Sequence, residues 1–180
     1  MLGTAVAGVE GAVLADPEGA PPSLAGHVVL VGPEGGWSPD EAIAACKAAI
    51  GEDPDWTAAK AWLGRAYFAA GDYALAADTL NEAADAGNLL AQTLLGDMLI
   101  LGYGGMQSPA EGAAMLEAAA MKGFAPAQNS LGLSYDNGEG VPEDDTAAAH
   151  WYRLAAEQGH PRAEANLGLM YQEGPGGLPK

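Results

Sequence analysis

Apolar and small residues recur along the chain with the spacing of amphipathic helices. In the stretch AWLGRAYFAA, Trp62, Ala66 and residues 68–70 fall on one helical stripe. Gly71 interrupts this stripe and Asp72 follows it, which is typical of a helix that ends on glycine before a second helix with an acidic cap. The pattern therefore predicts pairs of short helices joined by turns.

The helical pattern repeats at a fixed interval. Leu95, Leu131 and Leu167 each precede a glycine, and they are 36 residues apart. Upstream the interval shortens to 34 residues, as between Ala42 and Ala76. A repeated unit of two helices buries its apolar side only by stacking on its neighbours. We therefore predict an all-α fold, an α-solenoid of antiparallel helix pairs, over residues 38–180.

Predicted helix caps fall in the same register. Ser38, Asp72, Ser108 and Asp144 are separated by 34, 36 and 36 residues, and each stands just before a helical stripe. The segments SPDE at 38–41 and SPAE at 108–111 match capping boxes, in which the serine and glutamate side chains bind free backbone N–H groups.

Small residues predict how the two helices of a unit pack. The glycine after each repeated leucine lacks a Cβ, so the second helix can approach it closely. We expect Ala83, Ala119 and Ala155, which are 36 residues apart, to meet these glycines. The stretches YGGMQSPA and NGEGVPEDD are longer than AAGDYA and predict longer turns inside the later units.

Two known repeat families resemble these units. The segment LGLSYDNGEGVPEDDTAAAHWYRLAAEQGHPRAEANLGLMYQEG is similar to tandem Sel-one-like repeats, and AWLGRAYFAAGDYALAADTLNEAAD is similar to a tetratricopeptide repeat. We expect half a unit, one tetratricopeptide-like unit, two Sel-one-like units and a final half unit. The resemblance implies a protein-interaction scaffold without catalytic activity.

Residues 1–37 lie outside this register. The stretch AGHVVLVGPEGG is typical of an extended segment that enters a glycine loop, so this appendage is expected to be irregular and partly extended. It resembles the cofactor loop of RsmE-type SPOUT methyltransferases, which methylate a uridine of 16S ribosomal RNA. The resemblance implies contacts to S-adenosylmethionine from Gly32, Pro33, Glu34, Gly35, Gly36 and Trp37.

The methyltransferase interpretation is the alternative to the scaffold interpretation. The SPOUT family needs a further strand and a second loop, rich in arginine and leucine, to close its knot. Neither follows here, because the helical repeats begin at once. The segment is therefore interpreted as a vestigial or fused fragment that caps the solenoid, and cofactor binding is kept as the alternative.

Charge and composition restrict the partners. The formal net charge is −17, and only seven residues are Lys or Arg. Nucleic-acid binders and proteins that bind anionic membranes use clusters of basic side chains, which this chain lacks. A protein or peptide partner is expected instead. Cys46 is the only cysteine and is expected to be a buried thiol, since no disulfide can form within the chain.

No catalytic constellation or metal site stands out. His27, His150 and His160 are dispersed and are expected to have packing or surface roles. The acidic stretch 142–145 fits a helix cap at least as well as a cation site. No cofactor is expected in the scaffold interpretation. The compartment stays open: no signal peptide is evident, which favours the cytoplasm over the periplasm.

A partner is expected in the groove lined by the first helix of each unit. The exposed positions predicted there are Arg65, Phe68, Thr93, Asp97, Asn129, Asp136 and Gln172. The sequence ends after a first helix, whose apolar side is expected to be uncovered. Weak homodimerisation through that helix is therefore expected.

Overall fold

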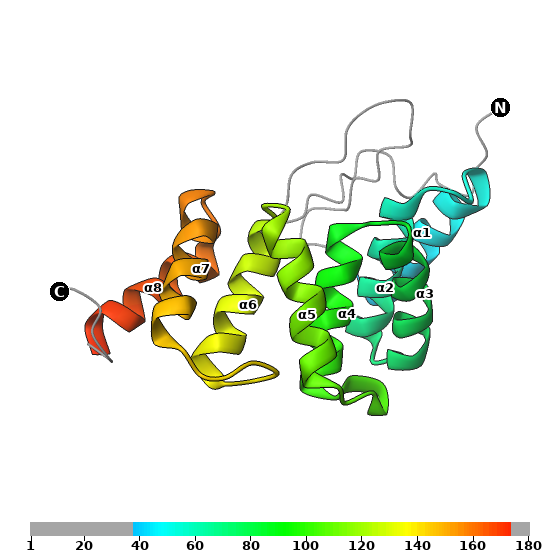
Figure 1. The fold of residues 1–180 in the computed structure, drawn as a ribbon. Helices are drawn as coiled ribbons and strands as arrows, with labels where there is room; N and C mark the ends of the chain where they lie inside the picture. The colour runs from blue at the N-terminus through cyan, green and yellow to red at the C-terminus, as the bar shows by residue number, and fades with distance from the viewer. Residues whose placement is uncertain (1–37, 174–180) are drawn as a thin grey trace. The chain divides into compact units, whose positions relative to one another are not determined.

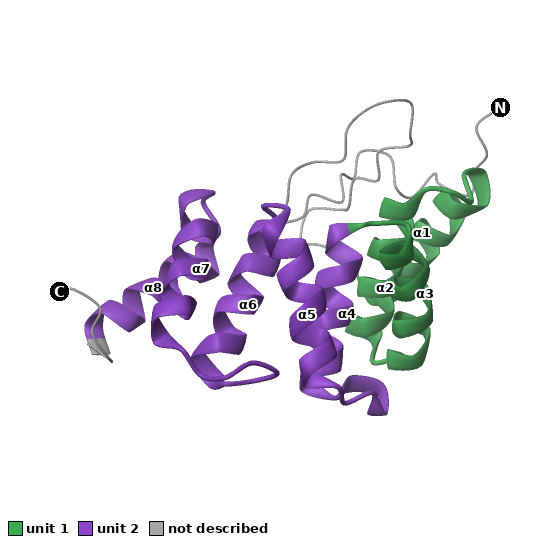
Figure 2. Cartoon of the chain, in the orientation of Figure 1, with its two compact units in different colours: residues 1–88 green, residues 89–180 purple. Residues whose placement is uncertain are grey.

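The computed structural model describes residues 38–173, and these residues form helices and no strand. The chain divides into two compact units, residues 1–88 and 89–180 (Figure 2). The predicted all-α helical-repeat fold is confirmed. The partly extended segment predicted for residues 1–37 lies outside the described residues, so its boundary with the repeats stays a prediction.

Within the described residues, each unit is a series of short helices labelled in Figure 1. The first unit contains α1 (Pro39–Glu52), α2 (Thr57–Ala70) and α3 (Tyr73–Asp85). The second unit contains α4 (Leu89–Leu101), the 3-10 turn η1 (Tyr103–Gly105), α5 (Pro109–Met121), α6 (Ala125–Asn137), α7 (Asp145–Glu157) and α8 (Pro161–Glu173). None of the described helices is long and apolar enough to cross a membrane.

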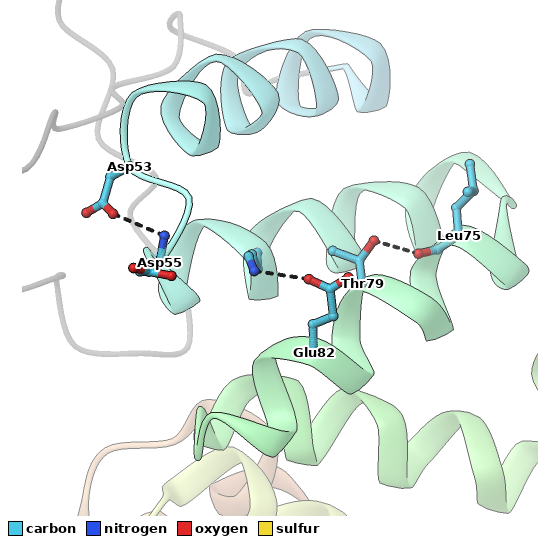
Figure 3. Close-up of polar contacts among 6 residues, drawn as sticks. Asp53, Asp55, Leu75, Thr79 and Glu82 are labelled. Carbon is cyan, nitrogen blue, oxygen red and sulfur yellow. Dashed lines mark hydrogen bonds and ion pairs between the residues drawn. The ribbon is translucent and has the colours of Figure 1, made fainter.

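In the first unit, α2 packs on both α1 and α3. Lys60 Nζ lies 3.0 Å from Glu82 Oε2 and links α2 to α3, and Thr79 Oγ1 donates a hydrogen bond of 2.7 Å to the Leu75 carbonyl (Figure 3). The ion pair is on the surface, where such pairs contribute at most about 1 kcal/mol. Burial raises the pKa of the Cys46 thiol to about 12, which confirms its expected role as a buried small side chain.

Two of the four predicted caps are confirmed. Ser38 and Glu41 form the capping box, in which the Glu41 N–H donates to Ser38 Oγ at 3.3 Å and the Ser38 N–H donates to Glu41 Oε2 at 2.9 Å. This hydrogen bonding lowers the pKa of Glu41. Asp144 accepts hydrogen bonds from the N–H groups of Thr146 and Ala147 at 2.9 and 3.0 Å.

The other two residues stand at the predicted N-cap positions, but the predicted side-chain capping is wrong. Asp72 and Ser108 precede α3 and α5, but neither side chain accepts a hydrogen bond from the helix start. Their ψ angles are 62° and 73°, whereas Ser38 has the extended ψ of 154°. The side-chain oxygen of a cap reaches the N–H groups of the first turn when the cap backbone is extended. The second predicted capping box, at 108–111, is therefore not formed.

In the second unit, α4 pairs with α5 and α6 pairs with α7, while α8 packs on α7. The turns inside these pairs span residues 102–108 and 138–144, against residues 71–72 in the first unit, so the longer turns are confirmed. Leu116, Leu131 and Tyr152 are almost fully buried between the helices. Met170 of α8 packs in the same core cluster as Tyr152.

Glycines permit the close approach of paired helices, as predicted. A Cβ on Gly132 would lie 2.7 Å from Tyr152 Cδ1, and a Cβ on Gly64 would lie 2.5 Å from Leu80 Cγ. A Cβ on Gly96 would likewise lie 3.1 Å from Leu116.

The prediction of which residues contact these glycines was wrong. Ala83, Ala119 and Ala155 are fully buried, but they are not among the nearest neighbours of the glycines. The large side chains one helical turn earlier, at Leu80, Leu116 and Tyr152, cover the glycines instead, since only a long side chain fills the space that a missing Cβ leaves.

Candidate protein-interaction face

The first helices of the second unit, α4, α6 and α8, lie next to one another. α4 packs directly on α6 as well as on its own partner α5. Ser130 Oγ of α6 donates a hydrogen bond of 3.2 Å to Asp97 Oδ2 of α4. Asn166 Nδ2 of α8 donates one of 3.2 Å to Asn129 Oδ1 of α6. Side-chain hydrogen bonds therefore join all three first helices.

One side of these helices is not covered by the second helices. It consists of positions spaced by four, three and four residues, which fall on one side of an α-helix. We call this surface the first-helix face. Its residues, all partly or fully exposed, are Leu90, Leu94, Asp97, Leu101, Pro126, Ser130, Leu133, Asn137, Arg162, Asn166 and Leu169.

The first-helix face is strongly apolar for a solvent-exposed surface. The side chains of Leu101, Leu133 and Leu169 are 58%, 43% and 54% exposed. Leu133 and Leu169 occupy the same repeat position as Asp97, at intervals of 36 residues. Large apolar side chains that recur on one side of a repeat array are typical of a docking surface for another protein.

Asp97 is the acidic residue of the first-helix face. Burial raises its pKa to about 7, although the hydrogen bond from Ser130 and the positive charge of Arg162 both act to lower it. Desolvation therefore dominates, because a carboxylate with little water around it holds its proton more tightly. Near neutral pH this group exists in both charge states.

The predicted groove residues fall in different environments. Thr93 and Asn129 are only 3% and 9% exposed, so their predicted exposure is wrong. Thr93 Oγ1 donates a hydrogen bond of 2.8 Å to the Leu89 carbonyl within α4, and Asn129 is held by Asn166. Both side chains are buried, and both are occupied by hydrogen bonds within the second unit.

Among the other predicted residues of this unit, Asp97 lies on the first-helix face. Asp136 accepts a hydrogen bond of 3.2 Å from the Tyr152 hydroxyl, so it is directed toward α7. This carboxylate raises the pKa of Tyr152, in addition to the larger effect of burial. Gln172 is exposed near the end of α8. Its role in partner binding stays a prediction.

Arg65 and Phe68 belong to α2 in the first unit, where they make local ring contacts. The Arg65 guanidinium lies 5.1 Å from the centre of the Trp62 ring, and Phe68 packs edge to face on Tyr73 at 5.4 Å. Both side chains are half-buried. Their proposed part in partner binding is not tested by these contacts.

Ser130, Leu133 and Leu169 were not among the residues predicted to line the groove. Leu133 and Leu169 follow Asp97 at intervals of 36 residues, and this spacing already placed them at the same repeat position. Exposed leucines are hard to recognise from sequence alone, because a leucine in an amphipathic helix is usually buried.

The remaining candidates for chemistry have structural roles in the described residues. His150 packs edge to face on Trp151 at 5.4 Å. His160 is buried, and its Nδ1 accepts a hydrogen bond of 3.3 Å from the Ala163 N–H at the start of α8. No group of His, Cys, Asp or Glu side chains between residues 38 and 173 is arranged to hold a metal ion.

The residues of the alternative S-adenosylmethionine site are not among those that the structure describes. Gly32, Glu34, Gly35 and Gly36 lie outside the described residues. Nothing in the family comparisons below covers this segment or supports the SPOUT resemblance. Binding of S-adenosylmethionine stays an untested prediction.

Family models match both units of the chain. The Sel1 repeat matches residues 89–124, 125–160 and 161–180, and a tetratricopeptide repeat matches residues 38–97. The first Sel1 match begins at Leu89, which is also the first residue of the second compact unit. No curated protein matches the chain.

Two solved structures are similar to this chain. One is c5321, described as a protective antigen of uropathogenic Escherichia coli strains with an SLR fold, with 34% identity and a TM-score of 0.61 over 72% of this chain. The match spans only 28% of that antigen. The other is a Sel1 repeat protein from Oxalobacter formigenes, with 30% identity and a TM-score of 0.55. It covers 63% of this chain and 88% of the Oxalobacter protein.

Proposed function

Because the chain belongs to the Sel1-repeat proteins, we propose that it is a non-catalytic scaffold that holds a protein or peptide partner on the first-helix face. Sel1 and tetratricopeptide repeats generally serve protein–protein interaction. The observation that carries the proposal is the exposure of Leu101, Leu133 and Leu169 on neighbouring first helices. Burying these side chains against a partner would provide a hydrophobic driving force.

The proposal also accounts for the rigidity of this surface. Hydrogen bonds link Asp97 to Ser130 and Asn129 to Asn166, so the three helices that present the leucines are held in register. A surface that is ordered before binding loses less conformational entropy when the partner docks. This favours a role in recognition over one in packing alone.

Site-specific photo-crosslinking tests the proposal. A photoreactive phenylalanine analogue is placed at position 133 on α6 or at position 118 on α5, both of which are exposed. In extracts of the source organism, position 133 is expected to give a discrete crosslinked product that position 118 does not give. Equal products from both positions, or a product from position 118 only, would contradict the proposal.

We also propose weak self-association through α8. Gly132 of α6 is covered by Tyr152, whereas an added Cβ on the equivalent Gly168 of α8 would have no atom of the described residues within 4 Å. Leu167 beside it is only half-buried, so apolar surface is open on this side of the helix. Sedimentation equilibrium should show a dimer that weakens on Leu167→Lys, and a monomer at all concentrations would contradict this.

The scaffold proposal assigns no role to S-adenosylmethionine. Calorimetric titration of the full chain with this cofactor should show no binding. Micromolar binding that is lost on Gly35→Val would instead favour the methyltransferase-derived alternative over the scaffold.

A further inference from the structure

Asp97 has an incomplete set of hydrogen bonds on a mostly apolar face. Its Oδ2 accepts the hydrogen bond from Ser130. Within the described residues, Oδ1 accepts none. A carboxylate oxygen can accept two hydrogen bonds, and Asp97 keeps part of its surface exposed, so its carboxylate has capacity for a further donor. The neighbouring face positions on α4 are Leu94 and Leu101, and the equivalent position on α6 is Leu133.

The charge of the second unit, which presents this face, favours a basic partner. Between residues 89 and 172, ten residues are Asp or Glu, and the basic ones are Lys122, Arg153 and Arg162. Such an acidic surface attracts cations and repels anions over several ångströms. The partner therefore needs apolar side chains for the leucines and, at Asp97, a positive charge in addition to that of Arg162, which does not offset the desolvation of this carboxylate.

We propose that the segment bound on the first-helix face is apolar and cationic, with apolar side chains on Leu101, Leu133 and Leu169 and one Lys or Arg paired with Asp97. This inference rests on the proposed function and adds the chemistry of the partner. A Lys ammonium or an Arg guanidinium donates hydrogen bonds and carries the charge that stabilises a desolvated carboxylate.

The charge balance argues against other occupants of this face. A second copy of the chain carries the same net charge of −17, so like charges oppose its docking on this face and keep the proposed association through α8 weak. Nucleic acids and anionic membranes are repelled for the same reason. A basic protein segment gains from both the apolar surface and the charge.

A designed peptide serves as the probe. A fluorescein-labelled amphipathic peptide with leucine on one side and lysine on the other is titrated with the full chain and followed by fluorescence anisotropy. A matched peptide with glutamine in place of lysine is the control. The lysine peptide should bind at least about tenfold more tightly than the glutamine peptide, which corresponds to about 1.4 kcal/mol. Equal affinities would overturn the proposal.

Paired variants separate the specific contact from general attraction. Asp97→Asn keeps the acceptor for Ser130 but removes the charge, whereas Glu117→Gln removes one charge from an exposed position on α5. The affinity for the lysine peptide should fall about tenfold in Asp97→Asn and less than about twofold in Glu117→Gln. Circular dichroism confirms that both variants are folded.

A second pair tests the face itself. Leu133→Asn should weaken binding of the lysine peptide, while Met121→Asn, at another exposed apolar position on α5, should not. If Leu133→Asn weakens binding but Asp97→Asn does not, the pairing with Asp97 is wrong and the proposed function stands. If Leu133→Asn binds as well as Met121→Asn, both are contradicted. A dimer that Leu133→Asn disrupts would assign the face to a second copy and overturn the proposal.

Discussion

Leu131 and Leu133 lie two residues apart on α6 but in opposite surroundings. Leu131 is 1% exposed and packs in the core cluster with Leu116 and Ala127. Leu133 is 43% exposed on the first-helix face. The same residue type thus stabilises the fold on one side of the helix and is available to a partner on the other. Stability and binding can therefore be changed separately in this molecule.

α8 can be compared with α6 in the same way. Its residues repeat those of α6 at intervals of 36, but the helices that pack on the two differ. Leu167 and Gly168 repeat Leu131 and Gly132, but among residues 38–173 none covers Gly168 as Tyr152 covers Gly132. Residues at the same repeat position therefore contribute differently to stability, depending on whether a second helix packs on them.

The largest difference is expected between two leucine-to-alanine substitutions on α6. Leu131→Ala should lower the free energy of unfolding by about 3 kcal/mol, because it leaves a cavity between packed helices. Leu133→Ala should change it by less than about 0.5 kcal/mol, because its side chain is largely in water. Urea denaturation followed by circular dichroism measures both, and equal losses would remove the distinction between the two sides.

The repeated glycines give the next largest effect. Gly132→Ala places a Cβ 2.7 Å from the buried Tyr152 ring, and it should cost about 2 kcal/mol even though alanine favours helices. Gly168→Ala meets no atom within 4 Å and should stabilise the chain by about 0.5 to 1 kcal/mol. Thermal unfolding of both variants tests this, and a loss in Gly168→Ala would show that α8 is covered in solution.

Asp97 is a titratable residue of the first-helix face, and its titration makes the free energy of unfolding depend on pH. The pKa of Asp97 in the folded chain is about 7, above its ordinary value of 3.8. Protonated Asp97 therefore contributes its full stabilisation at pH values below 3.8, and this contribution is lost as the pH rises through 7. Relative to Asp97→Asn, the wild type should lose about 1 to 3 kcal/mol between about pH 5 and about pH 8. Urea titrations at several pH values measure this, and parallel curves would contradict it.

Tyr152→Phe is expected to have the smallest effect. It removes the hydrogen bond to Asp136 but keeps the ring that covers Gly132. A loss of about 1 kcal/mol is expected, which is typical of one hydrogen bond. A loss as large as that of Gly132→Ala would show that hydrogen bonding, and not packing, holds α7 on α6.

The repeating helices were predictable from sequence because glycines, prolines and apolar stripes act locally. Gly71 ends α2 with a φ of +85°, as its position indicated, and Ser38 caps α1. Asp72 and Ser108 failed as caps because their backbone angles depend on the turn that precedes them. Local pattern sets where helices begin and end, but not how each cap side chain is directed.

The candidate site was less predictable, because side-chain exposure depends on tertiary packing. Asp97 lies on a first helix, and its part in partner binding stays a prediction. Thr93 and Asn129 were expected to be exposed, yet neighbouring helices bury them. Leu133 was missed because its sequence context does not distinguish an exposed leucine from the buried Leu131. The packing of α5, with Leu116 in the same core cluster as Leu131, against one side of α6 separates the two.

The most direct test of the first-helix face is methyl NMR of leucine-labelled protein during titration with the lysine peptide. The methyl signals of Leu101, Leu133 and Leu169 are expected to shift, while those of the buried Leu116 and Leu131 and of the exposed Leu75 on α3 stay in place. Shifts confined to Leu75, or none at the three face leucines, would contradict the account.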